Sequence, residues 1–316
     1  MVSQIAEICV TTLAVILCLI GLFGNLSLLA ATITYKELHH KICYMVAVLT
    51  SLHVVCLFCE LYLEALQLRF RATTRDECFH HTFVYIFAMI AQSVMFLMLS
   101  LDIMFAVVIP LRHRIFTTLP YVFYMCLPPF LIGAATVISI NLGMSNEAIE
   151  FCTPVQAFPR KMGWMTYMVN GLNVAAFVVN LVVFFAVKSR HQSPVMRDSV
   201  KNSKISCSDD VRLVRSFIVL AWVFVCSWCI SSISTHIAMR YLPKETSSIV
   251  QTYTVILALP TYCQCFFVTY IRSTRYRSAY RKQQRMFPCA AVASRSEVSC
   301  TQRSVIQRIG SEPSHP

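Results

Sequence analysis

Seven stretches of the chain are almost entirely apolar, and polar residues are concentrated between them. Each is longer than the roughly 20 residues that a helix needs to cross a hydrocarbon layer about 30 Å thick. None shows the alternation of a barrel strand, and only helices or closed barrels satisfy their backbone groups in lipid. We therefore predict an all-α membrane protein, a bundle of seven transmembrane helices at about 8–33, 42–64, 79–107, 120–142, 163–187, 216–239 and 248–271.

The composition agrees with a membrane location. Of the 316 residues, 57% are hydrophobic and 13% are charged, whereas a soluble domain has about 25% charged residues. The first apolar stretch is interpreted as retained, because no basic residue precedes it and it is too long for the apolar region of a secretion signal. Residues 1–271 then form one seven-transmembrane domain, with no internal repeat and no second domain.

Basic residues predict the orientation, because loops rich in Lys and Arg tend to stay cytoplasmic. With the N-terminus outside, the four cytoplasmic segments hold two, two, seven and nine of the 27 Lys and Arg residues. We therefore expect the N-terminus outside and the C-terminus inside. The net charge of +12 is then explained by topology and by attraction to anionic inner-leaflet lipid, so nucleic-acid binding is not needed.

Three cytoplasmic segments are expected to differ in structure. The polar segment 188–215 is predicted to be a loop, with several serines as phosphorylation targets. Residues 272–287 place Tyr276, Tyr280 and Phe287 near one helix face among basic residues, which predicts an amphipathic helix along the inner membrane surface. Residues 288–316 show no periodicity and are expected to form a disordered tail. Cys289, which follows the basic helix, is a candidate for palmitoylation, and a free thiol is the alternative.

The chain has 15 cysteines, but most lie within spans or on the cytoplasmic side, where thiols stay reduced. Only Cys78 and Cys152 fall clearly on the outer side. A bond between them would join the start of the third span to the second outer loop, and by chain entropy would be worth roughly 4 kcal/mol. We predict this disulfide; the alternative is two unpaired thiols.

Five short segments, in the right order and on the right sides of the spans, carry a resemblance to a known family. They are Gly21–Asn25, Glu77–Phe79, Leu101–His113, Phe151–Phe158 and Arg272–Tyr280. On these the chain resembles the nematode serpentine chemoreceptors of class SX (srsx), which are related to rhodopsin-like receptors, over residues 21–280. The resemblance implies a plasma-membrane receptor of sensory neurons, in their cilia, that detects small environmental molecules and signals through a heterotrimeric G protein.

The same resemblance assigns a framework role to Asn25, Asp102 and Pro110, and a place in the signalling switch to Arg112 and Trp228. At the end of the third span, however, the Arg that normally follows the Asp is replaced by Ile103. That Arg normally pairs with the Asp at rest and meets the G protein on activation, and Ile can do neither.

Three further departures affect the expected switch. Ser51 stands where Asp is usual in span two, Cys265 and Thr269 replace the Asn and Tyr of the span-seven pattern, and span six lacks Pro. Coupling is therefore predicted to be weak, unconventional or absent. Asp102 must face the aqueous inner mouth, take a proton, or pair with another cation, for which Arg112 and Arg114 are candidates.

A ligand is expected between the helices in the outer half of the bundle. Glu60 and Glu64 stand one helical turn apart near the outer end of span two, which favours a site for a cationic odorant or a proton-sensitive site. The alternative is that both reach water at the outer rim or pair with Arg69 or Arg71. The other polar residues at membrane depth are ligand candidates or interhelical hydrogen-bonding groups: Gln92, Asn170, Asn173 and His236.

Other classes of function receive less support. No metal site is predicted, because the adjacent His80 and His81 cannot both face one ion from a regular helix. No phosphate-binding loop or hydrolase motif occurs, so we expect neither an enzyme nor a cofactor. A small-molecule transporter remains an alternative, although the seven spans do not split into equal repeats. The altered switch residues allow a third interpretation of the function, in which the protein is a non-signalling partner that escorts another receptor.

Overall fold

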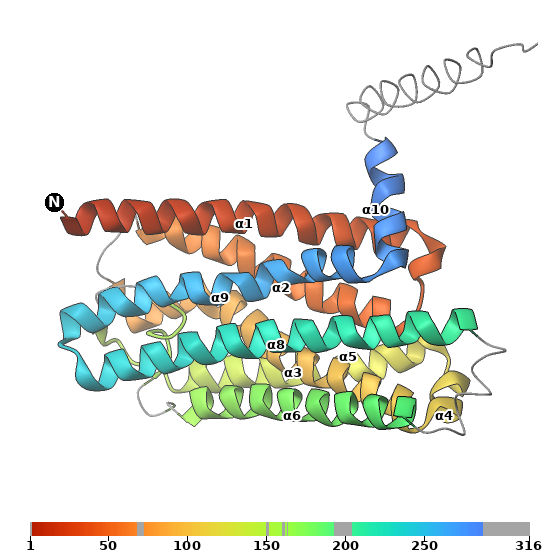
Figure 1. Ribbon diagram of the computed structural model, residues 1–316. Coiled ribbons are helices and arrows are strands. Elements are labelled where there is room, and N and C mark those ends of the chain that lie inside the picture. The colour runs from red at the N-terminus through yellow and green to blue at the C-terminus, as the bar shows by residue number, and fades with distance from the viewer. Residues whose placement is uncertain are drawn as a thin grey trace, which may run out of the picture.

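A computed structural model describes residues 2–67, 73–149, 152–159, 162, 164–192 and 204–286, and it is almost wholly helical (Figure 1). The helices are α1 (Val2–Thr34), η1 (Lys36–Leu38), α2 (Lys41–Gln67), α3 (Arg75–Val108), α4 (Pro110–Ile115), α5 (Thr118–Leu142), α6 (Trp164–Gln192), α8 (Lys204–Tyr241), α9 (Lys244–Arg272) and α10 (Thr274–Met286). Two short strands, β1 (Thr73–Thr74) and β2 (Ala148–Ile149), pair antiparallel near the start of α3.

In the described part of the chain seven long helices run alongside one another, which confirms the predicted helical bundle (Figure 1). Within the described residues, six of them are long and apolar enough to cross a membrane: α1, α2, α3, α5, α6 and α8. The remaining long helix, α9, carries charged residues only at its two ends and packs between α1 and α8. Each predicted span overlaps one of these seven helices, and α1 and α8 begin well before the predicted bounds.

Helix α3 is the centre of the bundle. In its most apolar part 72% of the residues are buried, against 28% in α5, α6 and α8. It contacts α2, α5, α6 and α8, so one helix touches most of the others. A side chain on α3 can therefore respond to a change in several neighbouring helices.

Helices α1 and α9 approach closely because α1 has glycine at the contact. A Cβ atom added at Gly21 would lie 2.6 Å from the Cys263 sulfur, and one at Gly24 would lie 2.8 Å from the Cβ of Phe266. Small residues allow such approaches between membrane helices. Next to them the buried Asn25 donates from Nδ2 to the Tyr262 carbonyl at 2.7 Å, so it fixes α1 against α9.

The polar segment 188–215 differs from the expectation of a loop, because it is helical at both ends. Helix α6 continues to Gln192 and α8 begins at Lys204, while residues 193–203 lie outside the described part of the chain. Hydrophilic residues with no glycine or proline allow both helices to continue past their apolar parts, and α6 ends two residues before Pro194.

Helix α10 turns away from the bundle axis after α9 (Figure 1). Its Tyr276 and Tyr280 are buried, and burial raises the pKa of the Tyr276 hydroxyl well above its ordinary value. Lys282 forms an ion pair of 2.8 Å with Glu37 of η1, at exposed positions. Phe287, Cys289 and the tail 288–316 lie outside the described residues, so the palmitoylation and tail predictions stay predictions.

Candidate functional site

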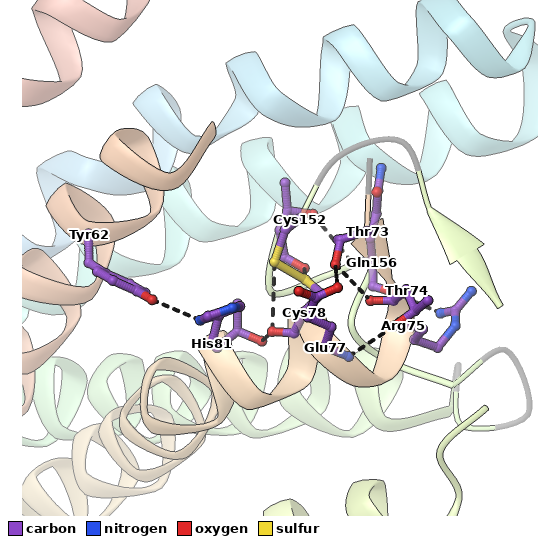
Figure 2. Close-up of a disulfide and its surroundings, with 11 residues drawn as sticks. Tyr62, Thr73, Thr74, Arg75, Glu77, Cys78, His81, Cys152 and Gln156 are labelled. Carbon is purple, nitrogen blue, oxygen red and sulfur yellow. Dashed lines mark hydrogen bonds between the residues drawn. A yellow bond between two sulfur atoms is a disulfide. The ribbon is translucent and has the colours of Figure 1, made fainter. Parts of the chain in front are cut away.

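The predicted disulfide is present between Cys78, in the first turn of α3, and Cys152 of the long segment that precedes α6 (Figure 2). The Cα atoms of the two cysteines are 5.3 Å apart. The prediction from the placement of the cysteines is therefore confirmed. We call this end of the bundle the disulfide end.

Arg75 fastens the same segment to α3 a second time. Its side chain is buried, donates from Nη1 to the carbonyls of Gln156 and Phe158, and forms a 2.9 Å ion pair with Glu147. The backbone N–H of Arg75 also donates to the Glu147 carbonyl. Charge-assisted hydrogen bonds of this kind are among the stronger ones in proteins. The sequence analysis does not single out Arg75, so this role was missed.

The start of α3 is held by local contacts that Figure 2 shows. The Thr74 hydroxyl accepts a hydrogen bond from the Glu77 N–H at 3.3 Å and so caps the helix. Thr73 donates to the Glu77 carboxylate at 2.6 Å. One turn further on, His81 hydrogen-bonds to Tyr62 of α2 at 2.7 Å, which joins α2 to α3 at the disulfide end.

A cavity of about 360 Å³ lies beneath the disulfide-bonded segment, between α2, α3, α6, α8 and α9. Thr153, Pro154, Val155 and Phe158 of that segment form part of its wall. Most of the remaining wall is apolar or aromatic. The polar side chains from the helices are Glu60, Glu64, Asn170, Ser231, Ser232, Thr235 and Thr254. This mixture suits a small organic ligand.

Both glutamates of α2 lie in this wall and are buried, with 5% and 7% of Glu60 and Glu64 exposed. Glu60 interacts with Tyr85 of α3, while its Oε2 has no hydrogen-bond partner among the described groups. Among the described residues the wall contains no Lys or Arg. Arg69 and Arg71, the partners considered from the sequence, lie outside the described residues.

The other ligand candidates are placed differently. Asn170 lies in the wall and donates to Ser232 of α8 at 2.8 Å. Gln92 is fully buried on α3 outside the wall, and its Oε1 lies 3.9 Å from the Cys56 sulfur. Asn173 is fully buried on α6 and is not in the wall either. The side chain of His236 is outside the part of the structure that is described.

Trp228 connects the cavity to the core. It lies in the wall, and its ring stacks on Phe224 one turn away, with centroids 6.3 Å apart. Phe224 stacks in turn on Phe96 of α3 at 4.4 Å. A ligand in contact with Trp228 would therefore act on a continuous aromatic column between α8 and α3.

At the opposite end of α3, the partner of Asp102 is a residue that the sequence did not point to. Asp102 Oδ1 lies 2.8 Å from Nε2 of His113 in α4 and accepts a 2.7 Å hydrogen bond from the Tyr121 hydroxyl of α5. Arg112 and Arg114, the cations considered from the sequence, are exposed. Pro110 is the first residue of α4, and the turn it starts brings His113 rather than either arginine to Asp102.

The Asp102 cluster joins four helices. Lys41, at the start of α2, donates to the backbone carbonyl of His113 and lies 5.0 Å from the centre of the Tyr121 ring. Asp102 itself is 1% exposed, and its neighbour Ile103 is 2% exposed and belongs to the apolar core. The absent arginine is thus replaced in two ways: Ile103 packs in the core, and His113 and Tyr121 satisfy the aspartate.

The remaining altered positions form ordinary contacts, two of them within a helix and one between α9 and α2. Ser51 bonds to the Ala47 carbonyl of its own helix at 2.9 Å, and Thr269 bonds to the Cys265 carbonyl in the same way at 2.7 Å. The Cys265 thiol lies 3.4 Å from Nδ1 of His53, a fully buried residue that the sequence analysis did not single out. In the described part of the chain, no three His, Cys, Asp or Glu side chains are grouped to hold a metal ion.

A comparison with protein families agrees with this geometry. The family model described as "Serpentine type 7TM GPCR chemoreceptor Srsx" matches residues 18–284, which is most of the chain and includes all seven long helices except residues 2–17 of α1. No curated protein matches the chain significantly. The family is a class of receptors and not of enzymes. The chain belongs to the Srsx family of serpentine seven-transmembrane chemoreceptors.

Proposed function

We propose that this chain is a chemosensory receptor that binds a small molecule carrying a protonated amine in the cavity at the disulfide end. In this proposal the N-terminus and the disulfide end face outward, and the protein resides in the plasma membrane of sensory cilia. The inner end, with the basic α10, faces the anionic lipid of the cytoplasmic leaflet. The family supports the receptor class, and the chemistry of the cavity supports the ligand class.

The observation that carries the ligand class is the buried Glu60. A carboxylate removed from water is costly unless a cation or hydrogen-bond donors compensate it. Its Oε2 lacks such a partner among the described groups, and Glu64 adds a second carboxylate on the same helix face. An ammonium group between them would supply both charge and donors, and the apolar wall would accept an aliphatic chain.

Signal transmission in this proposal runs through the aromatic column. A ligand that displaces Trp228 also displaces Phe224 and Phe96, and so changes the contact of α8 with α3. At the inner end, Ile103 supplies no guanidinium to a G protein. Coupling to a heterotrimeric G protein is therefore expected to be weak or unconventional, and robust ligand-stimulated nucleotide exchange by the unmodified protein would contradict this part.

The ligand class is tested with the full-length protein in lipid nanodiscs and with octylamine as the probe. Octylamine is expected to raise the thermal unfolding midpoint, because a ligand that binds only the folded state stabilises it. 1-Octanol has the same chain without the charge and is expected to have little effect. Glu60→Gln should remove the response to octylamine, while Asp76→Asn, an acidic position outside the cavity wall, should retain it. Equal responses of the two variants would contradict the proposal.

The altered switch also supports a second candidate, a non-signalling member that escorts another receptor. The observation in its favour is that Asp102 is satisfied by His113 and Tyr121 without an arginine. A fluorescent tag at the C-terminus, placed at the native locus, separates the candidates. Accumulation at ciliated sensory endings supports the chemoreceptor, whereas retention in internal membranes together with loss of a partner's surface delivery supports the escort.

A further inference from the structure

The wall of the cavity differs in thickness from one side to the other. On α3 and α9 the wall includes Tyr85, Met89 and Tyr262, and each of these residues is at most 9% exposed. On α6 and α8 it includes Tyr167, Ile233 and Ile237, which are 65%, 58% and 51% exposed. At this side the same side chains border both the cavity and the outer surface of the bundle. A single layer of side chains therefore separates the cavity from the surrounding lipid.

The roof of the cavity, in contrast, is fixed. It is formed by the segment that carries Thr153, Pro154, Val155 and Phe158. The disulfide attaches this segment to α3 covalently, and Arg75 holds it through two carbonyls and Glu147. Opening the roof would require the loss of several charge-assisted hydrogen bonds beside a covalent link.

The hydrogen bonds that join α8 to its two neighbours, α9 and α6, also differ. Towards α9, Ser227 donates to the Leu257 carbonyl, Ser231 donates to the Thr254 carbonyl, and the Thr235 and Thr254 hydroxyls are hydrogen-bonded. Towards α6, Asn170 donates a hydrogen bond to Ser232 of α8, and both residues are only half-buried. This bond joins two side chains, so rotation of one side chain opens it without any change in the backbone.

The thin part of the wall lies near one end of both helices. Tyr167 is in the first turn of α6, and Ile237 is about one turn from the end of α8 at Tyr241. Exposed aromatic side chains, Trp164 and Tyr241, mark the same level. Tryptophan and tyrosine are enriched where lipid headgroups meet the hydrocarbon, which is also the level at which the ammonium group of an alkylamine resides.

We propose that the ligand is a membrane-partitioning alkylamine that enters the cavity sideways from the outer leaflet, between α6 and α8. Ile233, Ile237 and Tyr167 form the gate, and the Asn170–Ser232 hydrogen bond is its latch. The ligand crosses the gate with either its alkyl chain or its ammonium group leading. It then comes to rest with the ammonium group against the glutamates of α2. This inference rests on the proposed function, because it concerns the same cavity and the same charged group.

The test measures entry rates rather than affinity. The full-length chain has three tryptophans, so Trp164→Phe and Trp222→Phe leave Trp228, in the cavity wall, as the fluorescent residue. The probe is 8-bromooctylamine, whose bromine quenches tryptophan on contact, mixed with nanodiscs in a stopped-flow instrument. The part of the quenching that Glu60→Gln removes reports occupancy of the cavity, and the remainder reports probe dissolved in lipid.

A matched pair of substitutions on α8 tests the gate. Ile233 lies in the wall, whereas Ile230, 52% exposed on the same helix, does not. Ile233→Phe is expected to slow both entry and exit about tenfold, equivalent to about 1.4 kcal/mol in the barrier, with an unchanged quenching amplitude. Ser232→Ala, which removes the latch, is expected to accelerate both. Ile230→Phe should behave like the parent.

The outcomes separate this inference from the proposed function. If Glu60-dependent quenching persists but Ile233→Phe and Ile230→Phe give equal rates, sideways entry is wrong and amine binding stands. If Ser232→Ala slows entry, the latch is wrong and the inference falls with it. If the parent shows no Glu60-dependent quenching with 8-bromooctylamine, the proposed ligand class fails and the sideways route fails with it.

Discussion

Asp102 of α3 and His113 of α4 lie 2.8 Å apart, and Ile103 stands beside the aspartate where the resembled receptors usually have an arginine. The two residues are 11 positions apart in sequence and come together because the chain turns at Ile109 and Pro110. The Tyr121 hydroxyl completes the site. A buried carboxylate at the end of α3 opposite the disulfide is thus tied to α4 and α5 instead of to its own helix neighbour.

His113→Ala is expected to destabilise the fold by about 1–3 kcal/mol, because it removes a partner from a buried carboxylate. Thermal unfolding in nanodiscs measures the change. Arg112→Ala is the matched control, since it removes an exposed cation from the same short helix and should stay within about 0.5 kcal/mol. Equal losses for the two variants would show that His113 is not the partner of Asp102.

Tyr121→Phe is expected to cost about 1 kcal/mol through the lost hydrogen bond to Asp102. Tyr124→Phe removes a hydroxyl from an exposed ring on the same helix and should be neutral. Because Tyr121 and His113 share one carboxylate, the double variant should depart from the sum of the single variants. Strict additivity in a double-mutant cycle would argue against a shared site.

Gly24→Ala is expected to destabilise the bundle by about 1–3 kcal/mol, since the new methyl group would overpack the contact with Phe266. The neighbouring atom is a Cβ, so it cannot move away unless α9 moves. Gly171→Ala is the control on α6, where an added Cβ meets nothing within 4 Å. In a helix interior that change should be neutral or stabilising by about 0.5–1 kcal/mol. A neutral Gly24→Ala would contradict the close approach of α1 and α9.

Cys78→Ser combined with Cys152→Ser is expected to lower stability by roughly 4 kcal/mol, given the separation of 74 residues. Unfolding of the oxidised parent and of the variant, both in nanodiscs, measures the loss. Cys226→Ser changes an exposed free thiol and controls for the loss of a sulfur atom. If reduction of the parent leaves its unfolding midpoint unchanged, the bond contributes no stability.

The fold and the disulfide could be predicted because both depend on one-dimensional features. Apolar length alone defines the seven spans, and only Cys78 and Cys152 fell clearly on the outer side of them. Helix ends are less determined, because polar residues allow α6 and α8 to continue beyond their apolar parts. The spacing of Glu60 and Glu64 predicts that they share one face of α2, but it does not reveal that this face borders the cavity.

Arg75 and His113 could not be identified because their roles depend on partners that only the fold brings close. Arg75 is one of three arginines before the third span, and its partner Glu147 lies 72 positions away in the sequence. His113 lies between two arginines, which are the more obvious partners of an aspartate. The rotation of the six-residue helix α4 about its axis decides whether Arg112, His113 or Arg114 faces Asp102. The sequence does not reveal that rotation.

Ile103→Arg tests whether the missing guanidinium limits signalling. Ile103 is 2% exposed next to Asp102, so a new arginine would either pair with the aspartate in place of His113 or extend to the inner mouth. In both positions it presents a cation at the end where the proposed function places the G protein, and nucleotide exchange measured with octylamine should rise above that of the parent. Ile103→Met keeps the volume without the charge and should cost less than about 1.5 kcal/mol in stability. Equal exchange with Ile103→Arg and Ile103→Met would mean that coupling is limited elsewhere, and the altered Cys265 and Thr269 of α9 would then be the positions to restore.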